Sequence, residues 1–312
     1  MVLFIDDQVC DTYFKSLKVL EDSKIFVNRK KRELSNSDRV LYVAQREYAT
    51  ISPSVNCQNF CHIASDSATT CIIVILIEHL TKSISLAHFD GADTLNGIKK
   101  MINELMYLYS KSSYCNRDPR FDLYLFGGFL DSKNLSIKLF NEIIYACSQS
   151  KEKIDLRIDV TLNTNTTIQN NENRPIVYGV SVDIITAEID VSSSSCCCPD
   201  FLLRNTRLLF SKNQSIVSVY DLKDQCIIIP EFSIFVNNNL YQLLELPDDV
   251  YLKLSSTSPH CQPENFVLSG KSTIKFVLKY KSKDLFKNKH RRYFLTEKCK
   301  WEMLDKDHKL LS

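Results

Sequence analysis

One unbroken apolar run marks the centre of the predicted fold. Residues 69–77 are almost all β-branched or aliphatic, with Cys71 near the start. A run of this length without polar interruptions is typical of a strand that is buried on both faces of a sheet. Residues 84–88 form a second apolar run and predict a partner strand beside it.

Two later segments carry the three- and four-residue spacing of amphipathic helices. The first follows a turn at residues 90–94, and its apolar positions are Ile98, Met101, Ile102, Leu105, Leu108 and Tyr109. The second is predicted from about residue 131 to 147, and its apolar positions are Leu135, Leu139, Ile143, Ile144 and Cys147. A strand is expected between the two helices at residues 122–126.

The rest of the chain is predicted to be rich in strands. Residues 154–162 alternate strictly between apolar and polar side chains, which predicts a half-buried strand. Further strands are expected at residues 177–189, 215–220, 226–229 and 272–280. Loops are expected at residues 163–174 and in the Ser/Cys tract at 192–198. Because neither a linker nor a repeat divides the chain, the pattern predicts helices and many strands in one compact unit.

Composition supports a globular chain and gives little support for binding to nucleic acid or to acidic membranes. The chain has 312 residues, 44% of them apolar, which is ample for a large core. Its formal net charge is only +2, so there is no whole-protein electrostatic argument for binding nucleic acid or an acidic membrane. The longest apolar run is far shorter than the ~20 residues that span a bilayer.

The 12 cysteines are the unusual feature of the composition. The N-terminus lacks the basic start of a signal peptide, so we expect a reducing intracellular compartment and free thiols. The alternative explanation is zinc, and Cys57, Cys61 and His62 have plausible ligand spacing. No second cluster supplies the other ligands, and no Cys-x-x-Cys pair occurs. We therefore expect neither a metal nor another cofactor.

Cys71 and His88 are the candidates for nucleophilic chemistry. They lie on strands predicted to be neighbours, at ends that can meet. A thiol nucleophile needs an adjacent base, and a third polar group would orient the imidazole. Spacing alone leaves the alternative open that Cys71 is a core residue and His88 a structural histidine.

Three sequence blocks around these residues closely resemble the protein N-terminal asparagine amidohydrolases. They are residues 41–48 (LYVAQREY), 65–71 (SDSATTC) and 88–94 (HFDGADT). The resemblance continues, in the same order along the chain, at residues 125–129, 175–180, 186–189, 217–221 and 254–259. It covers roughly residues 40–265, and the Asp-x-Ala-Thr-Thr-Cys block is its most specific part.

The resemblance implies an α+β fold, specifically the α-β-β sandwich shared with the cytotoxic-necrotizing-factor-like cysteine deamidases. It also implies an amidohydrolase that converts an N-terminal asparagine side chain to aspartate and releases ammonia through a thioester. The family's Cys-His-Ser triad carries over to Cys71 as nucleophile and His88 as base. Ser256 is the expected serine, and Ser258 is the alternative.

Recognition of the substrate requires contacts to a free α-amino group and to the side-chain amide. Asp66, which lies close to the nucleophile in sequence, is expected to bind the ammonium, and the alternative is a cap or turn residue. Ser65, Thr70 and Ser258 are also expected to contact substrate. The implied partners are proteins with N-terminal asparagine, and arginyl transfer and ubiquitin ligation would follow in the N-degron pathway. The expected location is cytoplasmic or nuclear.

We expect residues 1–312 to form a single amidohydrolase domain with a family core at 40–265 and a basic region at 279–312. Two other functions compete with this prediction. A non-catalytic module would bind N-terminal asparagine without turnover. Alternatively, the basic stretch at 279–292, in which aromatic residues are interleaved, could bind nucleic acid. A solvated basic face is favoured there, because no known motif is present.

Overall fold

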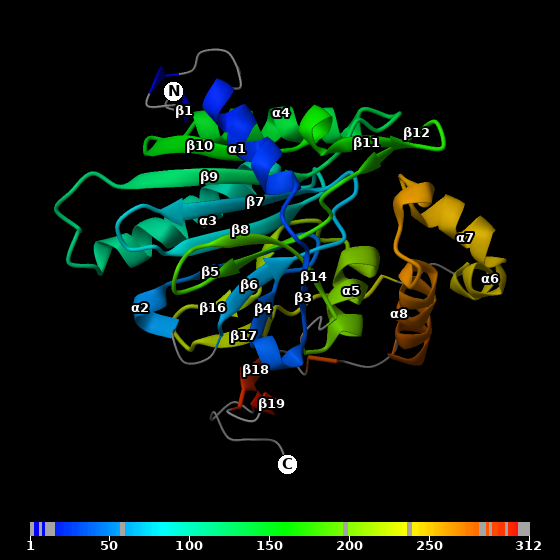
Figure 1. The fold of residues 1–312 in the computed structure, drawn as a ribbon. Helices are drawn as coiled ribbons and strands as arrows, with labels where there is room; N and C mark the ends of the chain where they lie inside the picture. Colours follow the sequence, from blue (N-terminus) through cyan, green and yellow to red (C-terminus); the bar gives the residue numbers. More distant parts are fainter. Residues whose placement is uncertain are drawn as a thin grey trace.

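The central feature of the computed structural model is an eight-stranded sheet (Figure 1). The structure describes residues 3–5, 8–9, 16–56, 60–195, 199–235, 239–280, 285–286, 289–296 and 299–304. In spatial order the strands are β15 (Val217–Ser218), β5 (Glu47–Ile51), β8 (Ile84–Phe89), β7 (Ile72–Glu78), β9 (Arg120–Gly127), β10 (Lys153–Val160), β1 (Leu3–Ile5) and β2 (Gln8–Val9).

The predicted central strand is confirmed as β7. All seven of its residues are buried, and it pairs antiparallel with β8 on one side and β9 on the other. The helices α3 (Thr94–Ser110) and α4 (Leu135–Ser148) cover one face of the sheet through a shared apolar cluster. The second helix begins a few residues later than predicted, because the Asp131 carboxylate accepts the N–H groups of Leu135 and Ser136.

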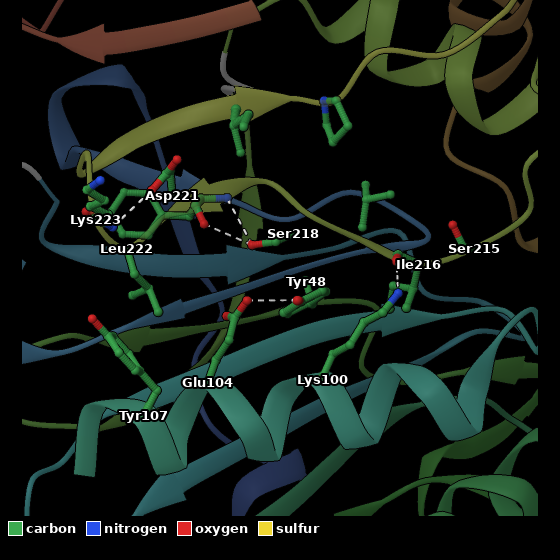
Figure 2. A pocket seen from close by; sticks show the side chains of 14 residues that line it. Tyr48, Lys100, Glu104, Tyr107, Ser215, Ile216, Ser218, Asp221, Leu222 and Lys223 are labelled. Carbon is green, nitrogen blue, oxygen red and sulfur yellow. Dashed lines mark hydrogen bonds between the residues drawn. The ribbon is translucent and has the colours of Figure 1, made fainter. Parts of the chain in front are cut away.

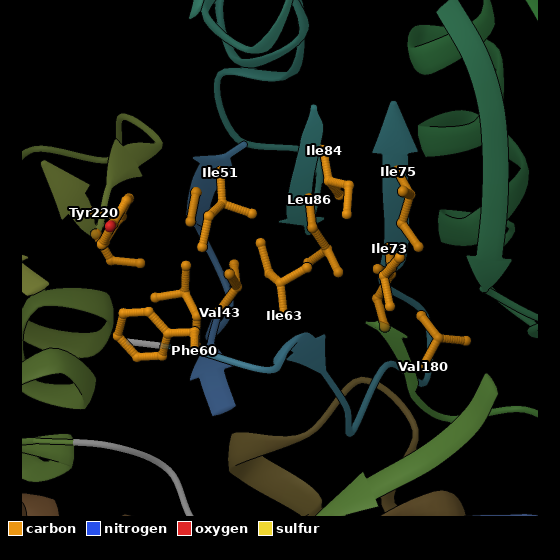
Figure 3. Close-up of a cluster of buried hydrophobic side chains, with 14 of the residues drawn as sticks. Val43, Ile51, Phe60, Ile63, Ile73, Ile75, Ile84, Leu86, Val180 and Tyr220 are labelled. Atoms are coloured by element: carbon orange, nitrogen blue, oxygen red, sulfur yellow. The ribbon is translucent and has the colours of Figure 1, made fainter. Parts of the chain in front are cut away.

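A second sheet covers the opposite face of the central sheet. Its strands in spatial order are β3 (Arg32–Leu34), β14 (Ile189–Ser194), β13 (Val180–Asp183), β6 (His62–Ser65) and β4 (Val40–Tyr42). Side chains such as Ile63, Ile73 and Leu86 fill the space between the two sheets (Figure 3). The fold is therefore α+β, with a helical layer, a central sheet and a second sheet.

The remaining elements surround these layers. The helices are α1 (Leu17–Val27), α2 (Pro53–Asn56), α5 (Phe201–Phe210), α6 (Leu240–Glu245), α7 (Asp248–Ser255) and α8 (Phe266–Tyr280), with short 3-10 turns η1 (Asn36–Asp38), η2 (Leu162–Asn165) and η3 (Pro259–Cys261). The strands β16 (Tyr220–Asp221), β17 (Cys226–Ile229), β18 (Arg291–Leu295) and β19 (Trp301–Leu304) form a further sheet. In Figure 1, α6, α7 and α8 stand to one side of the sheets, and they share a small apolar cluster of their own.

The predicted strand at residues 272–280 is wrong, because this segment belongs to helix α8. Its buried residues are Thr273, Ile274 and Val277, which lie at helical spacing. The β-branched composition favoured a strand, and packing against neighbouring helices overrode it.

Two predicted loops also contain strands. Residues 163–174 include the hairpin of β11 (Thr166–Gln169) and β12 (Glu172–Pro175). Strand β14 runs through the serines of the Ser/Cys tract to Ser194, where it pairs with β3. The three cysteines of that tract, residues 196–198, lie outside the described residues.

Strand β10 is buried on both faces rather than half-buried. Its pairing with β9 is interrupted by a bulge between Leu156 and Ile158. As a result, Leu156 packs in the helical layer, whereas Ile158 packs against the cluster between the sheets. Asp155 and Asp159 are both buried, although strict alternation predicted that they would face solvent.

The basic stretch at residues 279–292 is described only in part. Two of its arginines belong to intramolecular ion pairs, Arg291 with Asp200 at 2.6 Å and Arg292 with Asp221 at 3.3 Å. These contacts tie strand β18 to the rest of the chain. Across the described residues, no helix is both long enough and apolar enough to cross a membrane.

Candidate active site

Cys71, His88 and Ser65 project into the layer between the two sheets, at one end of it. Cys71 directly precedes β7, and His88 is the next-to-last residue of β8. The pairing of Ile73 with His88 places Cys71 diagonally across from His88 on the same face. Cys71 is partly buried and packs against the apolar cluster between the sheets. The predicted pair of nucleophile and base is therefore brought together.

Ser65 supplies the hydroxyl that holds the imidazole. It ends strand β6 of the second sheet, and its Oγ lies 2.8 Å from His88 Nδ1. Both side chains are buried. His88 Nε2 is also buried and has no hydrogen-bond partner among the described residues. With Nδ1 engaged by Ser65, Nε2 is the ring nitrogen left to exchange a proton with a thiol or a substrate.

Ser256, the serine predicted to complete the triad, does not hold the imidazole. Its Oγ accepts hydrogen bonds from Gln262 Nε2 at 2.7 Å and from the Ser258 N–H at 3.1 Å. Ser65 lies beside His88 instead. The sequence predicted that Ser65 would contact the substrate. The SDSATTC block contains this serine, but only the packing of β6 on β8 shows that it faces the histidine.

The segment containing Ser258 does reach the residue that precedes Cys71. Thr257 Oγ1 lies 3.1 Å from Oγ1 of Thr70, the residue before Cys71. Ser258 is 1% exposed, and its Oγ has no partner within the described parts of the chain. A segment that is far away in sequence thus contacts the residue next to Cys71, and Ser258 follows that contact directly in the chain.

Asp66 faces away from the layer between the sheets. It follows Ser65, so its side chain lies on the outer face of the second sheet. Its carboxylate accepts hydrogen bonds from Tyr42 Oη at 2.8 Å and from the Ser194 N–H at 2.7 Å. These contacts link β4, β6 and β14. They favour the turn or cap alternative over a role in binding the substrate ammonium.

Asp90 is a charged neighbour of the site. The sequence pattern predicted only that it belongs to a turn. Extending the β7–β8 register by one pair places Asp90 opposite Cys71. Its Oδ2 accepts hydrogen bonds from Arg46 Nε and Gln45 Nε2, both at 2.7 Å. The Arg46 N–H in turn donates to the His88 carbonyl at 2.9 Å. The available signal was its position two residues after His88, on the same face of the strand.

Burial sets the protonation states of the two reactive groups. Burial raises the pKa of the Cys71 thiol, and the nearby Asp90 carboxylate adds to this effect. Burial lowers the pKa of His88 to about 4, although Asp90 and Asp66 act in the opposite direction. At neutral pH the pair is therefore a neutral thiol beside a neutral imidazole. Such a pair suits general-base activation of the thiol during attack.

Comparison with known proteins identifies the family of the chain. The family model for protein N-terminal asparagine amidohydrolase matches residues 30–303. The chain belongs to this family. The protein of that name from Sus scrofa is 32% identical over 243 residues, which cover 78% of this chain and 76% of the relative. The Homo sapiens protein is 31% identical over 268 residues, covering 85% and 84%. The Arabidopsis thaliana protein is 27% identical over 290 residues, covering 85% and 80%.

In this family member, the end of β9 packs tightly against the backbone of Cys71. Gly127 has a φ of +86°, and a Cβ built there would lie 2.8 Å from the Cys71 carbonyl oxygen. A side chain at Gly127 would displace backbone rather than a flexible group. The glycine pair of the family block therefore allows β9 to approach the residue that carries the thiol.

A cavity of about 530 Å³ lies elsewhere, on the helical face of the central sheet (Figure 2). Its walls include Tyr48 and Glu104, joined by a hydrogen bond of 2.8 Å, and Lys100, which donates to the Ile216 carbonyl at 2.9 Å. It contains none of the predicted site residues.

The described residues contain no group of three or more His, Cys, Asp or Glu side chains that could hold a metal ion. Of the cluster considered for zinc, Cys61 is an exposed free thiol and His62 is buried. Cys57 lies outside the described residues.

Proposed function

We propose that the chain is a cysteine amidohydrolase that deamidates N-terminal asparagine in peptides and proteins. The observation that carries this proposal is the Ser65–His88 hydrogen bond beside Cys71 in a member of this family. The relatives named above all bear the name protein N-terminal asparagine amidohydrolase. The products would be an N-terminal aspartate and ammonia.

The mechanism follows from the protonation states of the pair. His88 Nε2 accepts the Cys71 proton while Sγ attacks the carboxamide carbon of the substrate asparagine. The imidazolium then returns this proton to the leaving nitrogen, the C–N bond breaks, and ammonia departs from a thioester. His88 next removes a proton from water, which attacks the thioester. The thiol takes the proton as the C–S bond breaks, which regenerates Cys71.

Two hydroxyls are available to contact the substrate amide. Ser258 Oγ is buried without a partner among described residues, and Thr70 Oγ1 lies beside Thr257. A hydroxyl that donates to the amide oxygen would stabilise the oxyanion of the tetrahedral intermediate. A pocket fitted to asparagine would reject glutamine by only ~10–200-fold if the extra methylene were the sole difference.

The layered architecture supports a finer proposal for the fold, and the chemistry of the product supports one for the pathway. A helical layer, a central sheet and a second sheet agree with the α-β-β sandwich of the cytotoxic-necrotizing-factor-like deamidases. An N-terminal aspartate would also suit a subsequent arginyl transfer, followed by recognition by a ubiquitin ligase. These steps would place the protein in the cytoplasm or nucleus.

Mass spectrometry of three peptides tests the activity directly. We expect a gain of about one dalton on a peptide that begins with Asn, and none on a peptide that begins with Gln or has an internal Asn. Cys71→Ala should abolish the reaction, because it removes the sulfur that forms the proposed thioester. The matched control is Cys115→Ala, which removes an exposed thiol and should leave the activity unchanged.

Two outcomes would contradict this proposal. Full activity in Cys71→Ala would exclude the thioester. Binding of the Asn peptide without release of ammonia by the wild-type protein would favour the alternative of a non-catalytic peptide-binding module.

A further inference from the structure

The carboxylate of Asp90 lies close enough to Cys71 to raise the pKa of its thiol, after the larger effect of burial. Extending the β7–β8 register by one pair beyond Ile72 and Phe89 places Asp90 opposite Cys71, and Cβ atoms in such pairs are about 4.5–5.5 Å apart. In asparagine, three bonds separate the α-nitrogen from the carbon that the thiol attacks. A substrate whose side-chain amide is held at Cys71 can therefore reach the residue opposite with its α-ammonium.

Asp90 is held in place and keeps capacity to accept another hydrogen bond. Its side chain is 9% exposed. Oδ2 accepts from Arg46 and Gln45, whereas Oδ1 accepts only from the Ala92 N–H at 3.1 Å among the described residues. Because a carboxylate offers about four lone-pair sites, Oδ1 can accept one further donor. The Arg46 contact fixes the orientation of the carboxylate.

The other carboxylate near the nucleophile in sequence does not compete for this role. Asp66 lies on the outer face of the second sheet and is bonded to Tyr42 and Ser194. Glu47 is fully buried against Arg204 and binds the Ala44 N–H. Asp90 therefore shares a face with both Cys71 and His88 at their end of the β7–β8 pair.

We propose that Asp90 binds the α-ammonium of the N-terminal residue and thereby restricts the enzyme to chain ends. The proposal relies on the function proposed above for the identity of the substrate. It explains how one site could reject internal asparagine, which has an uncharged peptide nitrogen at that position. Arg46 and Gln45 act as positioning residues, because they hold the carboxylate.

The test separates recognition of the amine from the chemistry. Two peptides are compared that differ only at the first residue: one begins with asparagine and the other with a succinamoyl group, which is asparagine without its α-amino group. Both are titrated into Cys71→Ala and into Cys71→Ala/Asp90→Asn by calorimetry. We expect the first protein to prefer the asparagine peptide by at least about 10-fold, and the preference to fall to within a few-fold in the second.

Kinetics on proteins that retain Cys71 give an independent readout. Asp90→Asn should lower kcat/KM for the asparagine peptide much more than for the succinamoyl peptide. Asp90→Glu, which keeps the charge, should restore part of the preference. Asp66→Asn is the matched comparison, and it should affect both peptides equally. Thermal melting of each variant identifies any that do not fold, and Asp90→Glu then gives the decisive comparison.

Equal losses on both peptides in Asp90→Asn would overturn the proposal, because they would indicate a purely structural role. Equal binding of both peptides by Cys71→Ala would overturn it as well. If wild-type protein releases no ammonia but Cys71→Ala still prefers the asparagine peptide, only the proposed amidase function fails and the role of Asp90 stands.

Discussion

At the scale of single residues, the site depends on which hydroxyl holds the histidine. Ser65 lies 2.8 Å from His88 Nδ1, whereas Ser256 binds Gln262. An imidazole that acts as a base must keep one nitrogen unprotonated and aimed at the thiol, and a hydrogen bond at the other nitrogen favours that state. Ser65 provides this bond from a different sheet.

Substitution of the two serines distinguishes their roles. We expect Ser65→Ala to lower kcat on the asparagine peptide by at least about 10-fold, with a smaller change in KM, because the imidazole loses its orientation. Ser256→Ala should keep kcat close to the wild-type value. Steady-state kinetics of the purified variants measure both constants. The assignment fails if Ser256→Ala is the variant that loses kcat.

At the scale of elements, the position of Cys71 depends on the end of β9. Gly127 and Gly128 both have left-handed backbone conformations, with φ of +86° and +59°. A Cβ at Gly127 would meet the Cys71 carbonyl, whereas a Cβ at Gly128 would first meet the Ile72 side chain at 3.0 Å. A side chain at either position would strain the backbone. At Gly127 it would also displace the Cys71 backbone, whereas at Gly128 it would displace the Ile72 side chain.

Substituting each glycine by alanine therefore distinguishes an effect on stability from an effect on catalysis. Both Gly127→Ala and Gly128→Ala should lower the free energy of unfolding, each by about 1–3 kcal/mol of backbone strain. Only Gly127→Ala should also lower kcat strongly, because it moves the backbone of Cys71. Urea unfolding and steady-state kinetics on the same preparations provide the comparison. Equal losses of kcat would show that the Cys71 contact is not decisive.

At the scale of the whole molecule, the site lies where two sheets meet, and this location buries its histidine. His88 is 3% exposed, and burial lowers its pKa to about 4. The unfolded chain has an ordinary histidine pKa of about 6.5. Neutral His88 thus stabilises the folded state above pH 6.5, and this contribution is lost as the pH falls towards 4.

The resulting pH dependence of stability is measurable. Relative to His88→Gln, the wild-type protein should lose up to about 3 kcal/mol of unfolding free energy between pH 7 and pH 4. Urea unfolding of both proteins at several pH values gives this difference. If the two curves run parallel through this range, His88 does not carry a lowered pKa.

The sequence determined the elements whose signals are local. The apolar run of β7, the stripe of α3 and the contiguous SDSATTC block can each be recognised within a short window, because helix and strand periodicities act over neighbouring residues. These signals were sufficient to single out Cys71 and His88 as candidates and to reveal the family resemblance. They failed at α8, where packing outweighed β-branched composition.

Only the tertiary structure decided which other groups join the site. The contact between Ser65 and His88 exists because β6 of one sheet packs face to face on β8 of the other. The contacts of Asp66, the approach of Thr257 to Thr70 and the bulge in β10 likewise depend on segments that are not neighbours in the sequence. Contacts between faces depend on how layers stack and where register shifts, and no short stretch of sequence contains that information.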